Sequence, residues 1–395
     1  MTTLVTPARV AVLGQGYVGL PLAMKAVAAG HDVVGIDAST ERVKRLAAGD
    51  SFVEDVPRVA LEAALRGGRY TVTDDALACE GFDVAVVTVP TPLHEGAPDL
   101  SYIESAARML APHVRPGCLV VLESTTYPGT TEQLFVPILE AGSQLIAGID
   151  SESLDRTDAF YSSFVATTVR VSTCRAAELA KLLENTFRHV NVALVNELAM
   201  FAHDLDIDVW EAIDAAATKP FGFMKFTPGP GVGGHCLPID PSYLSWTVRQ
   251  RLGRSFRFVE LANDINDHMP DYVASRLMRA LNRQGVALSR AKVLVLGLAY
   301  KRNAGDARES PAVALIHRLL ADGAEVSVAD PHVVERMPTD ALTRRVELSK
   351  RELERADAVV LVTDHDAFDY DLVTAHAVLV LDTRHRLDGP HVEQL

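Results

Sequence analysis

The sequence has little of what disulfide-bonded, metal-bound, membrane or nucleic-acid-binding proteins need. Its four cysteines, Cys79, Cys118, Cys174 and Cys236, never form a CxxC pair, which excludes a zinc ribbon and a thioredoxin motif. No stretch reaches the roughly 18 continuous apolar residues of a membrane span, and no secretory leader is recognisable. Acids outnumber bases by 52 to 38, which disfavours nucleic acid and anionic membranes as main partners. We therefore expect a soluble cytoplasmic protein with reduced thiols and no bound metal.

What is present begins with a glycine-rich turn between two strand-like segments. Residues 9–37 read RVAVLGQGYVGLPLAMKAVAAGHDVVGID, in which a short apolar strand leads into Gly14, Gly16 and Gly19. A helix and a second strand ending in Asp37 follow, and this is the context that a GxGxxG dinucleotide fingerprint requires. Asp37 would accept from the ribose hydroxyls and repel a 2′-phosphate, so the pattern favours NAD over NADP. The alternative is a plain tight turn.

Further apolar segments at 83–92 and 118–125, each after a helical pattern, predict a doubly wound parallel sheet. Ligands of such sheets bind at the carboxyl ends of the strands, where hydroxyl residues gather here. These hydroxyls either face the cofactor or substrate, or cap the next helix. The expected cofactor site comprises Gly14, Gly16, Tyr17, Val18, Gly19, Asp37, Arg42, Thr88, Pro90, Thr91, Ser124 and Thr125.

The middle of the chain predicts one long helix over 175–207, which contains neither proline nor glycine. Such a helix suits a domain connector or a dimer core. Lys181 and Asn185 lie four residues apart and therefore share a face, although a solvated lysine and a surface asparagine are the plain alternative. A segment rich in glycine, proline and aromatic residues follows, and it contains GVGGHCLPID at 231–240. Its Cys236 could be a nucleophile, a metal ligand or a buried filler, and the residues alone favour packing.

Residues 292–332 repeat the order strand, glycine turn, helix, strand, and the second strand again ends in an aspartate, Asp330. The turn keeps only Gly297 of a glycine fingerprint and continues with charged residues, Lys301, Arg302, Asp306 and Arg308. A cationic turn of this kind suits a second, different nucleotide diphosphate. A solvated loop is the alternative.

Taken in chain order, these pieces resemble the UDP-glucose/GDP-mannose dehydrogenase family. The matching segments are GQGYVGLPLA, ESTTYPGTT, AAELAKLLENT, KPFGFMKFTPGPGVGGHCLPIDP and GLAYKRNAGDARESPA, which span nearly the whole chain. GGHCLPID together with KxxxxDxRES is highly specific. His235, where enzymes acting on UDP-glucose tend to carry tyrosine, resembles the branch acting on UDP-N-acetylhexosamines.

The resemblance implies an oxidation of C6 of a nucleotide-bound hexose to a carboxylate with two NAD, in polysaccharide biosynthesis. It implies that Cys236 is the nucleophile, passing through a thiohemiacetal and a thioester. Lys181 and Asn185 match residues that hold the oxyanion, and Asp240 and Thr125 match those that place the water. Substrate contacts implied by the family match are Lys181, Asn185, Phe226, Gly233, Gly234, Lys301 and Arg308, the last two at the nucleotide end. We also expect a two-fold homodimer, because the helix over 175–207 is too long and too apolar to stand alone in solvent.

One family segment is missing. After TEQLFVPILEAG the family continues with a strand and loop of the form FxLAxSPER, which supplies a glutamate for the water and proton chemistry. Here Gly142 is followed directly by SQLIAGIDSES. By position alone, Glu123 and Glu152 could replace that glutamate. One strand of the first domain could also be missing, which would open a sheet edge.

The expected architecture is α/β in three parts: a shortened Rossmann NAD domain at 1–170, a central helical dimerisation and catalytic domain at 171–285, and a Rossmann-like UDP-sugar domain at 286–395. A working 6-dehydrogenase with a replacement base is the main hypothesis. The alternatives are a dehydrogenase that stops at aldehyde or thioester, and a non-catalytic nucleotide-sugar binder. A hydroxyacid dehydrogenase is disfavoured, because it would lack GGHCLPID and the third domain.

Overall fold

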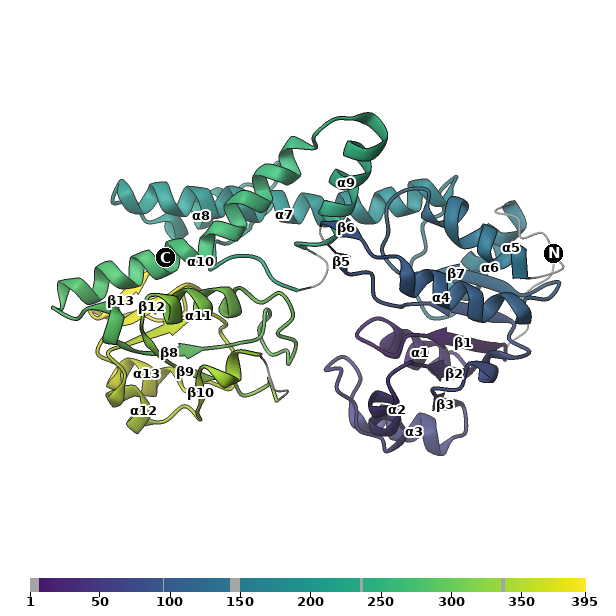
Figure 1. Cartoon of the computed structure of the whole chain (residues 1–395), viewed down its shortest axis with the longest axis horizontal. Helices are drawn as coiled ribbons and strands as arrows, with labels where there is room; N and C mark the ends of the chain where they lie inside the picture. Colours follow the sequence, from purple (N-terminus) through teal and green to yellow (C-terminus); the bar gives the residue numbers. More distant parts are fainter. Residues whose placement is uncertain (1–6, 95, 143–149, 235–236, 335–337) are drawn as a thin grey trace. The chain divides into compact units, whose positions relative to one another are not determined.

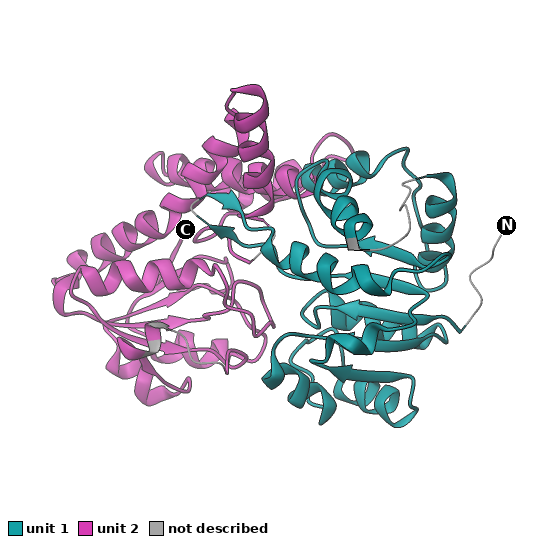
Figure 2. Cartoon of the chain, turned by 45° about the vertical axis from the view of Figure 1, so that its right-hand side comes forward, with its two compact units in different colours: residues 1–183 teal, residues 184–395 magenta. Residues whose placement is uncertain are grey.

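A computed structural model describes residues 7–94, 96–142, 150–234, 237–334 and 338–395. The chain divides into two compact units, residues 1–183 and 184–395, each containing a parallel sheet (Figures 1 and 2). The boundary lies inside one helix, so the three-part division at residues 170 and 285 stays a prediction. Among the described residues, none of the helices has the length and apolarity that crossing a membrane requires.

The first unit is a doubly wound sheet whose described strands run in the order β3-β2-β1-β4-β7, all parallel. Its larger strands are β1 Arg9–Leu13, β2 Asp32–Ile36, β3 Tyr70–Thr73, β4 Val84–Val87 and β7 Leu119–Leu122. A small antiparallel pair consists of β5 Leu93–His94 and β6 Ala97–Pro98. Its helices are α1 Gly19–Ala28, α2 Thr40–Ala47, α3 Arg58–Arg66, α4 Ser101–Leu110, α5 Val136–Gly142 and α6 Ser151–Ser162.

The central strand β1 shows why this sheet is covered on both faces. Val10 and Val12 pack into one core with α1 and α3, whereas Ala11 and Leu13 pack into a second core with α4. Alternating side chains of a strand point to opposite faces, so an all-apolar strand needs a helix layer on each side. The carboxyl ends of the strands are left as the edge where loops can form a site.

The second unit begins within α7 and ends in the second sheet. Its helices and that shared helix are α7 Cys174–Asp204, α8 Val209–Ala217, α9 Asp240–Leu252, α10 Arg257–Arg283, α11 Pro311–Ala321, α12 Lys350–Arg355 and α13 Tyr370–His376. Its strands are β8 Lys292–Leu296, β9 Glu325–Ala329, β10 Arg344–Arg345, β11 Ala358–Leu361, β12 Val380–Asp382 and β13 Val392–Gln394. The predicted long helix is confirmed, with an end three residues earlier than expected.

The second sheet repeats the first, in the order β10-β9-β8-β11-β12-β13 with every described pairing parallel. Val293 and Val295 of β8 pack against α10 and α11, and Leu294 and Leu296 pack against α12 and α13. From β8 the chain adds β9 and β10 on one side of the sheet, and then β11, β12 and β13 on the other side. The switch point therefore lies between β8 and β11, and open α/β sheets bind ligands at such a point. The α/β class and the two Rossmann-type sheets are as predicted.

Candidate functional site

The glycine turn after β1 has the geometry of a dinucleotide site. Gly14 has a φ of +92°, a conformation that side chains rarely adopt. A Cβ on Gly19 would lie 1.8 Å from the carbonyl oxygen of Gly14, so only glycine lets α1 start this close to the turn. Beside Gly16 there is nothing within 4 Å of the Cβ position. The open position and the N-terminus of α1 together fit a pyrophosphate.

Asp37 directly follows β2, at the predicted strand end, and its carboxylate is buried. It accepts from the backbone N–H of Gln15 at 2.7 Å and from that of Ser39 at 2.9 Å. Arg42, whose side chain is 41% exposed, reaches the same carboxylate at 2.9 Å. Arg42 also lies over the ring of Phe52, which contacts Tyr17 edge-on. The acid therefore holds the glycine turn and keeps the neighbouring arginine neutralised.

The hydroxyls at the strand ends hold the loops together. Thr88 donates to the carbonyls of both Leu13 and Gly14, at 2.8 and 2.7 Å. Ser124 donates to the carbonyl of Val89 at 2.8 Å, and Thr91 donates to that of Thr125 at 3.0 Å. These bonds tie the turn after β1 to the ends of β4 and β7, a role that neither sequence hypothesis had included.

The remaining predicted cofactor residues lie around this edge. Tyr17 and Val18 are exposed at the start of α1, and Pro90 is exposed after β4. Thr125 follows β7 and is half-buried. The steric need for Gly19, the open position at Gly16 and the acid at the end of β2 fit a dinucleotide that lacks a 2′-phosphate.

Replacing Asp37 with asparagine should weaken the preference for NAD. The wild-type enzyme should prefer NAD over NADP by at least about tenfold, because the carboxylate repels a 2′-phosphate by roughly 1–4 kcal/mol. Asparagine keeps the shape but releases Arg42 toward the phosphate. We expect the ratio of kcat/KM for NAD to that for NADP to fall at least about tenfold in Asp37→Asn. Asp50→Asn is the matched control, because Asp50 pairs with Arg45 at 2.8 Å in the same unit. Equal kcat/KM for both cofactors in the wild type would contradict this assignment.

In the second unit, Asn185 and Asp240 form a buried pair. The amide nitrogen of Asn185 on α7 donates to the carboxylate of Asp240 at 2.6 Å, and both residues are at most 1% exposed. Arg188 donates to the amide oxygen of Asn185 at 2.5 Å. Asp240 is the first residue of α9, where the helix dipole favours a negative charge. Lys181 is exposed on α7, one turn before Asn185.

The glycine loop that leads to Cys236 is anchored before the cysteine. Cys236 and His235 themselves lie outside the described residues. Before them, the N–H of Gly229 donates to buried Asn196 at 2.9 Å, and the N–H of Gly234 donates to the carbonyl of Arg308 at 3.1 Å. After them, the hydroxyl of Ser242 donates to the carbonyl of Pro238 at 3.2 Å.

The structure gives Gly233 and Gly234 a specific neighbour. A Cβ on either residue would lie 2.7 Å from an atom of Tyr300. Tyr300 directly precedes Lys301. The two glycines thus let the loop at 229–234 pack against the cationic turn of the second sheet.

The cationic turn itself follows β8 at the switch point. Gly297 has a φ of +91°, and a Cβ there would meet Thr363 at 2.5 Å. Lys301 and Arg302 are exposed. Arg308 donates to both oxygens of Asp306, with its Nε at 2.9 and 3.1 Å, so the acid fixes the guanidinium. Phe226, the last predicted substrate contact, is half-buried and meets Phe187 edge-on at 5.8 Å.

Sequence reasoning missed Arg384, which follows β12 at the same edge. Its Nε donates to the carbonyl of Val362 at 2.6 Å, and its guanidinium lies 2.7 Å from where a Cβ of Gly229 would be. Burial lowers the pKa of Arg384, against the attraction of Asp364 and Asp382. The available signal was its place directly after a buried parallel strand, in AVLVLDTR.

The two glutamates considered as a replacement base differ in position. Glu123 directly follows β7, at the edge of the sheet where Ser124 and Thr125 lie, and accepts from the hydroxyl of Tyr161 at 2.6 Å. Burial and then the nearby Glu123 raise the pKa of Tyr161 above its ordinary value. Glu152 is exposed in the first turn of α6. The direct junction after Gly142 lies outside the described residues.

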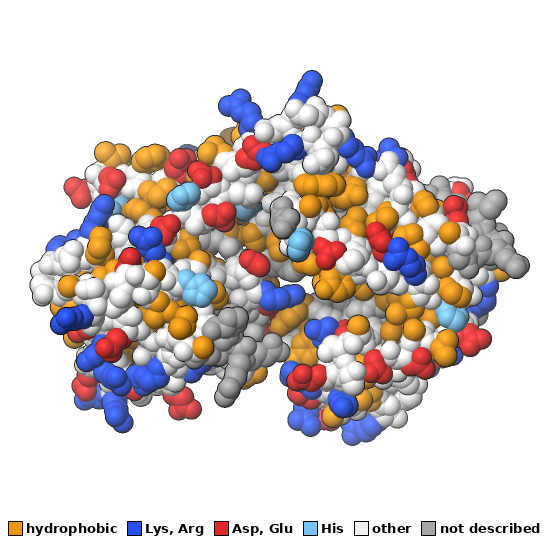
Figure 3. Space-filling model, viewed as in Figure 1, with side chains coloured by type: hydrophobic (Ala, Val, Ile, Leu, Met, Phe, Trp, Pro, Cys, Tyr) orange, Lys and Arg blue, Asp and Glu red, His pale blue; other side chains and the backbone are white. Residues whose placement is uncertain are grey.

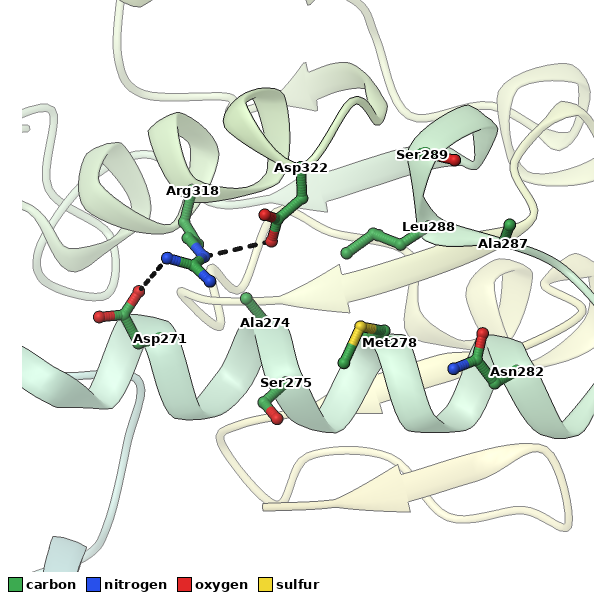
Figure 4. Close-up of a pocket in the computed structure, with 10 residues that line it drawn as sticks. All are labelled: Asp271, Ala274, Ser275, Met278, Asn282, Ala287, Leu288, Ser289, Arg318 and Asp322. Atoms are coloured by element: carbon green, nitrogen blue, oxygen red, sulfur yellow. Dashed lines mark hydrogen bonds and ion pairs between the residues drawn. The ribbon is translucent and has the colours of Figure 1, made fainter.

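A surface pocket of about 420 Å³ lies elsewhere, between α10, α11 and the segment 287–289 (Figure 4). Arg318 bridges its walls, at 3.6 Å from Asp271 and 3.1 Å from Asp322. The pocket contains none of the predicted site residues, and its one cation is already engaged by two acids. The switch point is therefore the better candidate. In the part of the chain that the structure describes, no group of His, Cys, Asp or Glu is arranged to hold a metal ion.

Comparisons with known proteins agree with this layout. Three family models match in order: the NAD binding domain of the UDP-glucose/GDP-mannose dehydrogenase family over residues 8–154, its central domain over 175–268 and its UDP binding domain over 294–389. A UDP-N-acetyl-D-mannosamine dehydrogenase of Pyrococcus horikoshii is 36% identical, covering 91% of this chain and 90% of the relative. An NDP-N-acetyl-D-galactosaminuronic acid dehydrogenase of Ralstonia nicotianae is 33% identical, covering 95% of each.

A solved structure is also similar over the full length. The structure of a UDP-D-ManNAc dehydrogenase from Pyrococcus horikoshii has a TM-score of 0.86 and 32% identity, covering 98% of each chain. The chain carries the glycine fingerprint, the segments around Asn185 and Asp240 and the cationic turn in the order of the three family domains. It therefore belongs to the UDP-glucose/GDP-mannose dehydrogenase family, and it is an NAD-dependent nucleotide-sugar dehydrogenase.

Proposed function

We propose that this enzyme oxidises C6 of a UDP-N-acetylhexosamine to the uronate, and that UDP-N-acetyl-D-mannosamine is its preferred substrate. The observation that carries the proposal is the buried pair of Asn185 and Asp240, with the anchored loop that leads to Cys236. The name of the Pyrococcus horikoshii relative supports the choice of sugar. The missing segment removes one carboxylate of the family but none of these residues.

In the proposed reaction, NAD held at the glycine turn of Gly14 to Gly19 would supply the hydride acceptor for each of two oxidations. C6 first loses a hydride and the hydroxyl proton to become an aldehyde. The thiolate of Cys236 adds to this carbonyl, and the amide of Asn185 and the ammonium of Lys181 stabilise the oxyanion. After loss of the second hydride, C6 is a thioester. Water, oriented by Asp240 and Thr125, adds and releases the carboxylate and the thiol.

The nucleotide end of the substrate is proposed to bind at the cationic turn. Lys301 and Arg308 would contact the diphosphate or base, and Arg384 adds a third cation at the same edge. Arg308 suits this role because Asp306 fixes its guanidinium through Nε and Nη2. Gly233, Gly234 and Phe226 are proposed to line the sugar.

The experiment that tests this function is the yield of NADH per nucleotide sugar. Limiting UDP-N-acetylmannosamine, UDP-N-acetylglucosamine, UDP-glucose and GDP-mannose should each be incubated with excess NAD. We expect two NADH per molecule of a UDP-N-acetylhexosamine, and the highest kcat/KM with the mannosamine sugar. A yield of one would show that the reaction stops at the aldehyde, whereas two NADH per enzyme without further turnover would show that it stops at the thioester. No NADH with any of the four would contradict the proposal.

We also propose that the enzyme is a two-fold dimer that forms through α7. Seven large apolar residues of this helix and its end are 45–67% exposed, at spacings of three, four and seven: Leu179, Leu183, Phe187, Leu194, Leu198, Phe201 and Leu205. Hydrophobic side chains reach the surface along this part of the molecule at the upper left of Figure 3. A stripe at this spacing matches the seam between packed helices, and two-fold dimers are the commonest closed assembly.

A charge placed in the stripe should separate the proposed dimer. Leu198→Glu should shift sedimentation at micromolar concentration toward the monomer, because pairing would bury a carboxylate in an apolar seam. Val59→Glu is the matched control, since Val59 is 73% exposed on α3, outside the stripe. A wild-type monomer at micromolar concentration, or equal effects of both variants, would contradict this assembly.

Two further proposals concern the roles of the domains and the location of the enzyme in the cell. We propose that residues 1–170, 171–285 and 286–395 act as the NAD, catalytic and nucleotide-sugar parts, which the order of the family domains supports. We propose that the enzyme works in the cytoplasm. The unpaired thiols of Cys79, Cys118 and Cys174 support a reducing compartment.

A further inference from the structure

The cationic turn is held by two buried side chains, Asp330 after β9 and His365 after β11, from the segments that follow the two strands beside β8. The backbone N–H groups of Leu298 and Ala299 donate to one oxygen of Asp330, at 2.6 and 3.0 Å. Further along, the N–H of Asn303 donates to Nδ1 of His365 at 2.9 Å. Lys301 lies between these attachment points, so its backbone is fixed from both sides.

His365 and Asp330 are themselves paired. Nε2 of His365 donates to Asp330 at 3.0 Å, and the two side chains are 0% exposed. Because Nδ1 accepts from an N–H, the ring proton belongs on Nε2, and the imidazole is neutral in this arrangement. Burial alone would raise the pKa of Asp330, but bonds from His365 and from the N–H groups of Ala299 and Val333 outweigh it and lower that pKa. Asp330 is therefore a stable acceptor.

The far end of the turn is clamped as well. Asn303 has a φ of +56°, which an asparagine tolerates better than most residues. Its side chain forms two bonds with Asp366, donating to the carboxylate at 2.6 Å and accepting the backbone N–H at 2.8 Å. Arg302 pairs with both Asp366 and Asp364. Residues 364–366, which follow β11, thus bind Arg302 and Asn303 through ion pairs and hydrogen bonds, and His365 is the middle residue of this segment.

We propose that His365 is a positioning residue for substrate binding: through Nδ1 it fixes Asn303, and so places Lys301 for the nucleotide end of the substrate. This inference rests on the proposed role of Lys301. His365 is 35 residues from Asp330 and 62 from Asn303 in sequence, and its ring is held by packing against His332 and Phe368. It touches neither substrate nor cofactor in this role.

Removing the ring should affect one substrate only. In His365→Ala, the N–H of Asn303 loses its acceptor, and the turn is no longer fixed on that side. We expect the KM for the UDP-sugar, and the inhibition constant of UDP alone, to rise at least about tenfold. The KM for NAD and the kcat at saturating sugar should stay within about twofold of wild type. The glycine turn after β1 and the Asn185–Asp240 pair do not depend on the bond between His365 and Asn303.

Two conservative variants separate the two ring nitrogens. His365→Asn can place an amide oxygen near the position of Nδ1 and keep the acceptor for Asn303. His365→Gln can place an amide nitrogen near Nε2 and keep only the donor to Asp330. We expect asparagine to restore the KM for the UDP-sugar to within about threefold of wild type and glutamine to leave it raised. Rescue by glutamine but not by asparagine, or by neither, would overturn the proposal.

His31 gives a matched control for the cost of losing a buried histidine. It is 1% exposed, and its Nδ1 also accepts a backbone N–H, from Ala8 at 3.2 Å, but it lies in the first unit. His31→Ala should lower the melting temperature without raising the KM for the UDP-sugar. If both alanine variants raise that KM alike at equal loss of melting temperature, His365 has only a structural role.

The variant Lys301→Ala tests the proposed nucleotide site separately from the positioning role of His365. A raised KM for the UDP-sugar in Lys301→Ala but not in His365→Ala would refute the role of His365 alone. No rise in Lys301→Ala would instead remove the proposed nucleotide site, and the positioning role with it.

Discussion

Cys236→Ser should form no uronate and carry no covalent adduct, whereas the wild-type enzyme should gain the mass of the sugar nucleotide on Cys236 during turnover. The thiolate is the only side chain proposed to bond to C6, so its loss should lower the rate of uronate formation by at least about 10,000-fold. Intact mass spectrometry after rapid mixing with NAD and substrate measures the adduct. Cys174→Ser is the matched control, because Cys174 is a half-buried thiol at the start of α7.

The missing glutamate segment predicts which step of this reaction is slow. Loss of a general base raises the barrier to hydrolysis by about 3–5 kcal/mol. If no other residue replaces this base, a burst of NADH should precede a slower steady rate, and hydroxylamine, a better nucleophile than water, should increase that rate. Linear NADH production without an adduct would show instead that another residue supplies the base. In that case Glu123, at the end of β7, is the first residue to replace.

Asp240→Asn should lower kcat by about 100- to 1,000-fold with little change in the KM for NAD. Asparagine keeps the size of the side chain but removes the charge that orients Asn185 and, in the proposed reaction, the water. Because both residues are buried and 2.6 Å apart, the loss also leaves the amide of Asn185 opposite a second amide. Stopped-flow measurement of each hydride transfer should show the larger effect after the first one.

Asp208→Asn provides the control for replacing an acid at a helix start. Asp208 caps α8 by accepting the N–H groups of Trp210 and Glu211, so asparagine should cost at most about 1 kcal/mol of stability and leave kcat unchanged. Equal losses of kcat in the two variants would mean that Asp240 only stabilises the fold.

Local patterns predicted those parts of the site whose signal lies within a few residues. The turn at Gly14 to Gly19 and the acid at Asp37 could be predicted because strand, turn and helix follow one another in the chain. The second sheet was predicted for the same reason, from the apolar segment before Gly297. The long helix was readable because its 31 residues contain no proline or glycine.

Contacts between distant segments left no such signal. Asn185 and Asp240 are 55 residues apart, and the family resemblance named them without indicating that they bond to each other. The sequence suggested Thr88 as a ligand or a cap residue. Its bond to Gly14 could not be predicted, because that bond depends on β4 lying next to β1 in the sheet. Arg384 and His365 were missed for the same reason: their positions depend on the order of strands in the second sheet.

The position of α7 limits how this enzyme can be recombined with its relatives. The boundary between the compact units follows Leu183, and a chimaera joined there would build α7 from two halves that come from different parents. The first half, from Cys174 to Leu183, is shorter than the roughly 12–15 residues that an isolated helix needs. A junction within 163–173, which contains neither helix nor strand, would transfer the NAD-binding sheet and leave α7 from a single parent. Cofactor-binding modules should therefore be exchanged ahead of Cys174.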